Sequence, residues 1–142
     1  MKGRLSRISV ALAVALAVAA FGLSAPARAA SGPLDGKTFL AQSGEEGKAA
    51  DSKDTLVFQG GRMRSTACDA YGFGDGAYSA IERKGSIGFH ARTQSAKEGI
   101  IVWNGAVRGD ALDGTFVWTK PGQKEIHYWV KGNLKKTGDK TP

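Results

Sequence analysis

The sequence has only one cysteine, Cys68, among its 142 residues. An intramolecular disulfide cannot form, so packing alone must hold the fold together. The usual catalytic signatures are also missing, since there is no Gly-x-Ser-x-Gly, no phosphate-binding glycine loop and no His-Glu-x-x-His pair. We therefore expect a protein that is not an enzyme.

Histidine is nearly as scarce as cysteine. His90 and His127 are the only two, and the alternation along their segments places both on outward-facing positions. Outward histidines favour neither haem ligation nor a catalytic triad. Cys68 with Asp69 and Asp75 matches neither the oxygen cage of calcium nor the ligand set of zinc. We expect no metal and no cofactor.

Acidic residues are absent from the first 29 positions. Basic residues within positions 1–7 precede an apolar run over 8–23, and the A-x-A pattern at 27–29 matches a peptidase site. A membrane anchor would need about 20 apolar residues, which is longer than this run. We interpret residues 1–29 as a cleaved signal peptide and expect a periplasmic or secreted protein without a stable membrane anchor.

Cleavage changes the charge of the chain. The full sequence carries +7, but the segment 1–29 holds four of the 20 basic residues and none of the 13 acidic ones, which leaves +3. The remaining bases are scattered along the chain, so we expect no nucleic-acid partner. The mature chain has the size of one domain, which we place at 30–134, followed by a polar, disordered tail at 135–142. The oligomeric state stays open.

Beyond residue 30, apolar and polar residues alternate between glycine-bearing turns, and no stretch has helical spacing with caps. This pattern is typical of antiparallel strands. Three hairpins are expected around Gly60–Gly61, Lys84–Gly85 and Gly109–Asp110, where glycine supplies the positive φ that primed turns require. Their registers predict these inward pairs: Phe58 with Met63, Leu56 with Ser65, Ala80 with Phe89, Tyr78 with Ala91, Trp103 with Phe116, Val107 with Leu112 and Ile101 with Trp118.

Two further strands, at 37–42 and 125–134, bring the expected total to eight. Closing the last strand onto the first would remove the unpaired edges of such a sheet. We therefore predict an all-β fold, an eight-stranded antiparallel up-and-down barrel, with a β-sandwich as the alternative. The glycine-rich, charged segment 43–54 is expected to be a mobile loop over one end, with a short helical turn near 46–50.

Aromatic residues dominate the predicted inward face. Gly105 and Gly114 oppose each other there, and they either let the strands coil sharply or leave floor space for a ligand. On the second interpretation, the ligand-binding residues are Tyr78, Phe89, Trp103, Gly105, Gly114, Phe116 and Trp118.

The loop 68–76 is the densest cluster of polar, aromatic and glycine residues. It is either a binding lip, formed by Cys68, Asp69, Tyr71 and Phe73, or a connection whose aromatic rings plug the barrel end. Cys68 itself is expected to be buried and inert, with an intermolecular bridge or a ligand contact as alternatives. Trp129 faces outward with three aliphatic residues, and this patch either contacts other molecules or is covered by a loop.

Three segments carry a family resemblance. Gly36-Lys37-Thr38-Phe39, Thr55-Leu56-Val57-Phe58 and the stretch 103–115 resemble the lipocalin-type small barrels of the calycin group, over most of the mature chain. The family's usual Gly-x-Trp opening is replaced here by Gly36 and Phe39. The resemblance implies an eight-stranded barrel that holds a small apolar ligand or is reused for protein binding, and it implies no catalytic residue.

Two functions follow from these observations. The first is an exported binding protein for a small apolar ligand. The alternative is a protein-interaction or inhibitor module of the cell envelope, acting on an envelope protein through its outer face and the 68–76 loop.

Overall fold

A computed structural model of the protein describes residues 32–136 and residue 138. The signal peptide expected at 1–29 and positions 137 and 139–142 of the expected tail lie outside them. In the described part, no helix is long and apolar enough to cross a membrane. The elements are β1 (Thr38–Glu45), β2 (Ser52–Gln59), β3 (Arg62–Ser65), the 3₁₀ helix η1 (Thr66–Tyr71), β4 (Gly76–Arg83), β5 (Ser86–Ser95), β6 (Gly99–Arg108), β7 (Ala111–Thr119) and β8 (Ile126–Leu134).

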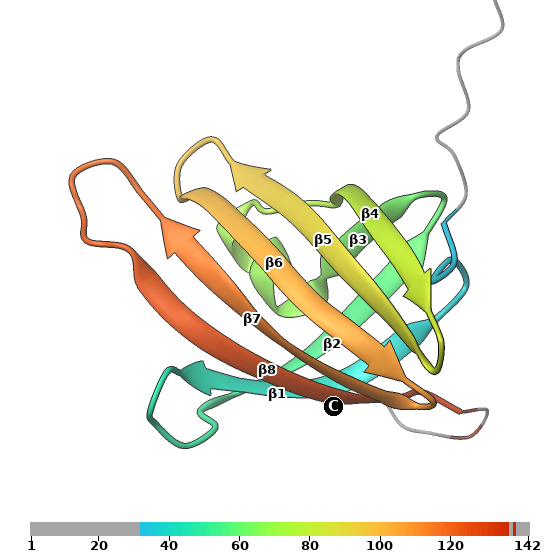
Figure 1. Ribbon diagram of the computed structural model, residues 1–142. Helices are drawn as coiled ribbons and strands as arrows, with labels where there is room; N and C mark the ends of the chain where they lie inside the picture. The colour runs from blue at the N-terminus through green and yellow to red at the C-terminus, as the bar shows by residue number, and fades with distance from the viewer. Residues whose placement is uncertain (1–31, 137, 139–142) are drawn as a thin grey trace, which may run out of the picture.

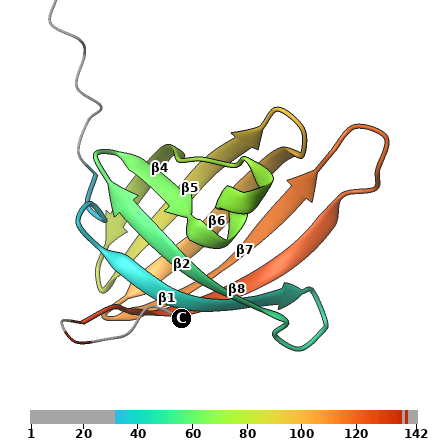
Figure 2. The same ribbon diagram turned by 180° about the vertical axis from the view of Figure 1, so that it is seen from behind.

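The eight strands form one closed antiparallel barrel in which each strand pairs with the next (Figures 1 and 2). The barrel closes where β8 pairs with β1, from Phe39 opposite Leu134 to Glu45 opposite Tyr128. The all-β, up-and-down barrel predicted from the sequence is therefore confirmed, and the sandwich alternative is wrong.

The strand registers agree with the hydrophobic pattern. All seven inward pairs predicted for the three hairpins are present, including Trp103 opposite Phe116 and Phe58 opposite Met63. A shift of one residue would have turned every apolar side chain toward water, so burial and turn geometry select the same pairing.

The three tight turns differ in their backbone. Gly60 and Gly61 both have positive φ (59° and 73°), and Gly109 has φ 58°, as primed hairpin turns require. At Lys84–Gly85 only the second residue has positive φ (77°), which is the pattern of an unprimed turn such as type II. The expectation of a primed turn was wrong there, because a lysine strongly disfavours the left-handed region.

The expected loop at 43–54 is shorter than the sequence pattern indicated. β1 continues to Glu45 and β2 begins at Ser52, so Ser43 pairs with Ser52 and Ala41 with Asp54. The expected helical turn near 46–50 is absent as well. Backbone pairing needs no apolar side chains, and Ser43 and Asp54 are buried in spite of their polarity.

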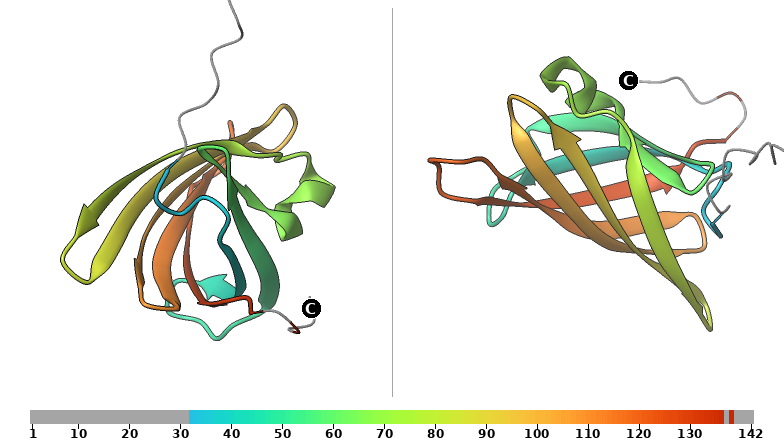
Figure 3. Two further views of the ribbon diagram at one scale, coloured as in Figure 1. Left: turned by 90° about the vertical axis from the view of Figure 1, so that its right-hand side faces the viewer. Right: turned by 90° about the horizontal axis from the view of Figure 1, so that it is seen from above.

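The two ends of the barrel are built differently. Because the chain reverses direction at every strand, the three two-residue turns lie at one end and the longer connections at the other (Figure 1). The segment before β1 lies across the end with the tight turns (Figure 3, left). Leu34 in this segment is fully buried.

The segment before β1 forms a plug at this end of the barrel, and hydrogen bonds hold the plug in place. The Tyr78 hydroxyl donates to Asp35 Oδ1 (2.8 Å) and accepts from the Leu34 N–H (3.2 Å), while the Gly61 N–H donates to the Asp35 carboxylate. Burial and the bond to Asp35 raise the pKa of Tyr78 to about 12. Tyr78 therefore anchors the segment that closes this end of the barrel.

The half of the interior next to the plug is filled. The Phe58 ring packs edge-on against Phe39, Tyr78 and Phe89, with centroids 5.1 to 6.0 Å apart. Gly105 lies beneath this cluster, where a Cβ would sit 2.7 Å from the Phe89 ring and 2.9 Å from the Asp113 carbonyl oxygen. The room above Gly105 is thus occupied by Phe89.

We expect Gly105→Ala to lower the free energy of unfolding by about 1–3 kcal/mol, because the ring or the β6–β7 ladder must shift to admit the methyl group. Gly88→Ala on β5 is the matched control, since its Cβ would meet only the Ile81 carbonyl oxygen at 3.9 Å. That control should change stability by less than about 1 kcal/mol. Urea unfolding followed by tryptophan fluorescence measures both, and equal losses would contradict the packing described.

Candidate binding pocket

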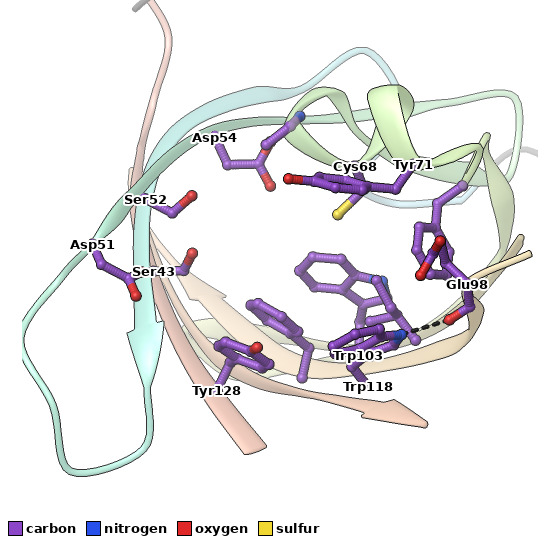
Figure 4. A pocket seen from close by; sticks show the side chains of 14 residues that line it. Ser43, Asp51, Ser52, Asp54, Cys68, Tyr71, Glu98, Trp103, Trp118 and Tyr128 are labelled. Atoms are coloured by element: carbon purple, nitrogen blue, oxygen red, sulfur yellow. Dashed lines mark hydrogen bonds between the residues drawn. The ribbon is translucent and has the colours of Figure 1, made fainter. Parts of the chain in front are cut away.

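The end opposite the plug holds a cavity of about 490 Å³ (Figure 4). It is surrounded by the ends of β1 and β7, the first halves of β2, β6 and β8, the helix η1 and the β5–β6 connection. Six aromatic side chains line its wall: Tyr71, Phe73, Trp103, Phe116, Trp118 and Tyr128.

Three of these rings pack against one another along the floor, with Phe116 stacked on Tyr128 and tilted by 34° relative to Trp103. The Phe116 centroid lies 4.4 Å from that of Trp103 and 4.6 Å from that of Tyr128, with the Tyr128 ring nearly parallel. Neighbouring strands supply them, since Phe116 pairs with Trp103 on one side and with Tyr128 on the other. Trp103 is 1% exposed, and its indole N–H donates to Thr93 Oγ1 (3.2 Å). The floor is therefore continuous, apolar and held in place.

Trp118 forms the side of the mouth. Its indole N–H donates to the Glu98 carbonyl oxygen (2.6 Å), and the Glu98 carboxylate pairs with Lys120 (2.9 Å). These bonds join the β5–β6 connection to the end of β7. Two contacts therefore hold the rim in shape: a hydrogen bond to a backbone carbonyl group and an ion pair between side chains.

Asp54 is a buried carboxylate on the opposite wall, only 7% exposed. Its Oδ1 accepts from the N–H groups of Thr55 (2.7 Å) and Ala67 (3.0 Å), and its Oδ2 accepts from the Ser65 hydroxyl (2.5 Å). Burial raises its pKa, and these three hydrogen bonds work against that rise. The carboxylate thus ties β2 to the start of η1.

The helix η1 lies over the mouth. Gly72 caps its C-terminal end with a φ of 78°, which suits glycine, and the bidentate Arg64–Asp69 ion pair fastens the helix to β3. Cys68 and Tyr71 reach the cavity from this helix (Figure 4). Burial raises the pKa of the Cys68 thiol, so the thiol stays protonated at neutral pH.

The residues predicted for ligand binding divide into two groups. Trp103, Phe116 and Trp118 line the cavity, as do Cys68, Tyr71 and Phe73 of the predicted lip. The others lie elsewhere: Tyr78, Phe89, Gly105 and Gly114 belong to the filled half or its strands, and Asp69 pairs with Arg64.

The polar part of the pocket was not predicted from the sequence pattern. Asp54 and its neighbours Asp51 and Ser52 fell within the segment expected to be a loop, and Glu98 lies in a strand connection. The sequence could have revealed Tyr128 and Ile101, because alternation places Tyr128 on the same side as buried Val130 and Ile101 on the inward side opposite Trp118.

The outer patch around Trp129 is partly covered. The Trp129 indole N–H donates to the Lys48 carbonyl oxygen (2.9 Å) in the β1–β2 connection. Among the described residues, Tyr71 and Ile81 are the large apolar side chains that stand most exposed, each at 63%. His90 and His127 are exposed, as predicted.

Chemically, the pocket can hold a flat or apolar body against the stacked rings, with polar groups within reach at the rim. No histidine, lysine or arginine lines it, among the described residues. Nor does the described part of the chain contain a group of three or more histidine, cysteine or acidic side chains placed to hold a metal ion.

Comparison of the chain with known proteins finds no matching family model, no matching curated protein and no matching solved structure.

Asp54→Asn should fold, because an amide can accept the two N–H bonds and donate to Ser65. A carboxylate whose pKa is raised by folding adds stability that is lost as pH rises from the unfolded value near 3.8 through the folded value. The stability of the wild type relative to Asp54→Asn should therefore fall with rising pH in that window, as measured by urea unfolding at a series of pH values.

Asp35→Asn provides the contrast of opposite sign. The N–H of Gly61 lowers the pKa of Asp35, so the wild type should gain stability over Asp35→Asn as pH rises toward 3.8. Differences of the same sign for both variants would contradict the assigned environment of Asp54.

Proposed function

We propose that this protein is an exported, lipocalin-like barrel that binds a small molecule with an apolar or aromatic body. The observation that carries the proposal is the cavity of about 490 Å³, open at one barrel end and floored by stacked aromatic rings, while the other end is plugged. A small-molecule site of this kind spans roughly 300–1,000 Å³ and is mostly apolar with a few polar groups.

The asymmetry of the barrel supports a ligand site over a simple core. A domain of this size needs its interior packed to be stable, and the half next to the plug supplies that packing through Phe58 and its neighbours. In the mouth half, Trp103 and Phe116 belong to the same buried core, but Trp118 and Tyr128 are only partly buried and line the cavity. Apolar surface left open in this way is costly unless something occupies it.

The site of action follows from the N-terminal pattern. A signal peptide at 1–29 would deliver the barrel to the periplasm or the exterior, and the eight-stranded architecture is the one implied by the calycin resemblance of Gly36–Phe39 and the stretch 103–115. Membership in that group is part of this proposal. We envisage a carrier or receptor for its ligand.

We also propose that the pocket is not catalytic. Its thiol, Cys68, is protonated at neutral pH because burial raises its pKa, and no histidine of the described chain lies beside it to act as a base. The carboxylate of Asp54 is already engaged by three donors. The pocket residues are thus suited to holding a molecule.

Two tryptophans allow a matched test with N-phenylnaphthylamine, a neutral apolar fluorophore. Trp118 lines the cavity and Trp129 lies on the outer wall, and each donates its indole N–H to a carbonyl oxygen in a loop. Trp118→Leu should weaken binding about ten-fold through loss of an aromatic contact, whereas Trp129→Leu should leave the dissociation constant within about two-fold of wild type.

Fluorescence titration of the three proteins measures this difference. Absence of binding to the wild type would count against the pocket proposal. A larger loss in Trp129→Leu than in Trp118→Leu would move the binding surface to the outer wall.

A further inference from the structure

The charged side chains that line the cavity are all acidic. Asp51, Asp54 and Glu98 line it, and no basic side chain of the described residues does so. The protein as a whole carries a positive net charge, so an acidic pocket does not follow from its composition. The negative charge is therefore a local property of the pocket lining, and it favours a ligand of opposite charge.

The three acids are not equivalent. Glu98 has its own cation, since Lys120 Nζ lies 2.9 Å from its carboxylate. Asp54 has none, because its hydrogen bonds within the described chain come from two backbone N–H groups and the Ser65 hydroxyl. At 7% exposure it is a buried carboxylate that forms no ion pair with any residue of the described part of the chain.

Ionising a buried carboxylate of this kind costs free energy. Three donors stabilise its charge, but burial dominates and raises its pKa. An ionised carboxylate offers about four acceptor positions, and the protein uses three of them here. One position on Oδ2 remains for a donor brought by another molecule.

The wall facing Asp54 suits a cation as well. Figure 4 shows the Asp54 carboxylate across the cavity from Trp103 and Tyr128. A positive charge over the face of a tryptophan or tyrosine is attracted by the ring quadrupole, and more strongly where water is excluded. Trp103 is only 1% exposed, so the partly buried Tyr128 is the ring that a cation in the cavity can reach, on the side opposite the carboxylate.

We propose that the ligand is a small organic cation, with an aromatic or apolar body against the rings of Trp118 and Tyr128 and a protonated amine that donates to Asp54 Oδ2. This inference rests on the proposed binding function and narrows it. It excludes ligands with a carboxylate head, such as fatty acids, because their charge would face Asp51 and Asp54. An amine that carries an N–H fits better than a quaternary ammonium, which has no donor for the free acceptor position.

Three compounds with one ring system separate charge from shape: naphthylethylamine, naphthylethanol and naphthylacetate. Isothermal titration calorimetry at pH 7 should give the wild type at least about ten-fold tighter binding of the amine than of the alcohol, with the acetate weakest. In Asp54→Asn the ratio of amine to alcohol affinity should fall toward one.

Asp113→Asn is the matched control. It removes the same charge from an exposed position on the outer wall, where Asp113 lies 3.9 Å from Lys131. The ten-fold ratio should persist in this variant, which separates a local contact with Asp54 from a general effect of net charge.

The outcomes distinguish the two proposals. If the alcohol binds and the amine binds no tighter, or if Asp54→Asn keeps the ratio, the cation inference is overturned and the binding function stands. If none of the three compounds binds to the wild type and N-phenylnaphthylamine does not bind either, both proposals fail.

Discussion

Closure of β8 onto β1 is the interaction on which the rest of the structure depends. It pairs the last free strand edges of an eight-stranded sheet and makes an inside, so that alternate residues of every strand face one enclosed space. Without a disulfide, stability comes from what fills that space and from the backbone ladder around it. Burial of Trp103 at the centre of the wall is a direct consequence of this closure.

The barrel is closed at one end and open at the other because its connections differ in length. Two-residue turns cannot reach across an opening, so the segment before β1 supplies the plug through Leu34 and the Asp35–Tyr78 bond. The longer connections and η1 ring the opposite mouth without filling it. A packed half thus supports a hollow half, which suits a site that must keep its shape while empty.

Asp54 affects both the stability of the fold and the proposed function of the pocket. A barrel built for stability alone would place an apolar residue at this inward position, since burying a carboxylate opposes folding. Three donors from β2, β3 and η1 meet the carboxylate and partly offset that cost. The remaining desolvation cost of the carboxylate would be offset by a bound cation. For this reason we connect the choice of ligand to Asp54.

The sequence by itself determined that there are eight strands, the registers of the three hairpins and which side of their strands avoids water, but not the extension of β1 and β2 into 43–54. The registers and the inward sides follow from period-two alternation and from glycine in the tight turns, which act over a few residues and are visible locally, as the pairing of Trp103 with Phe116 illustrates. Only the tertiary structure decided how deep along the barrel each inward residue lies, which separates Trp118 in the cavity from Phe89 in the packed half. It also decided the role of Asp54, because a polar residue in a polar segment carries no sign of burial until the strands beside it close the barrel.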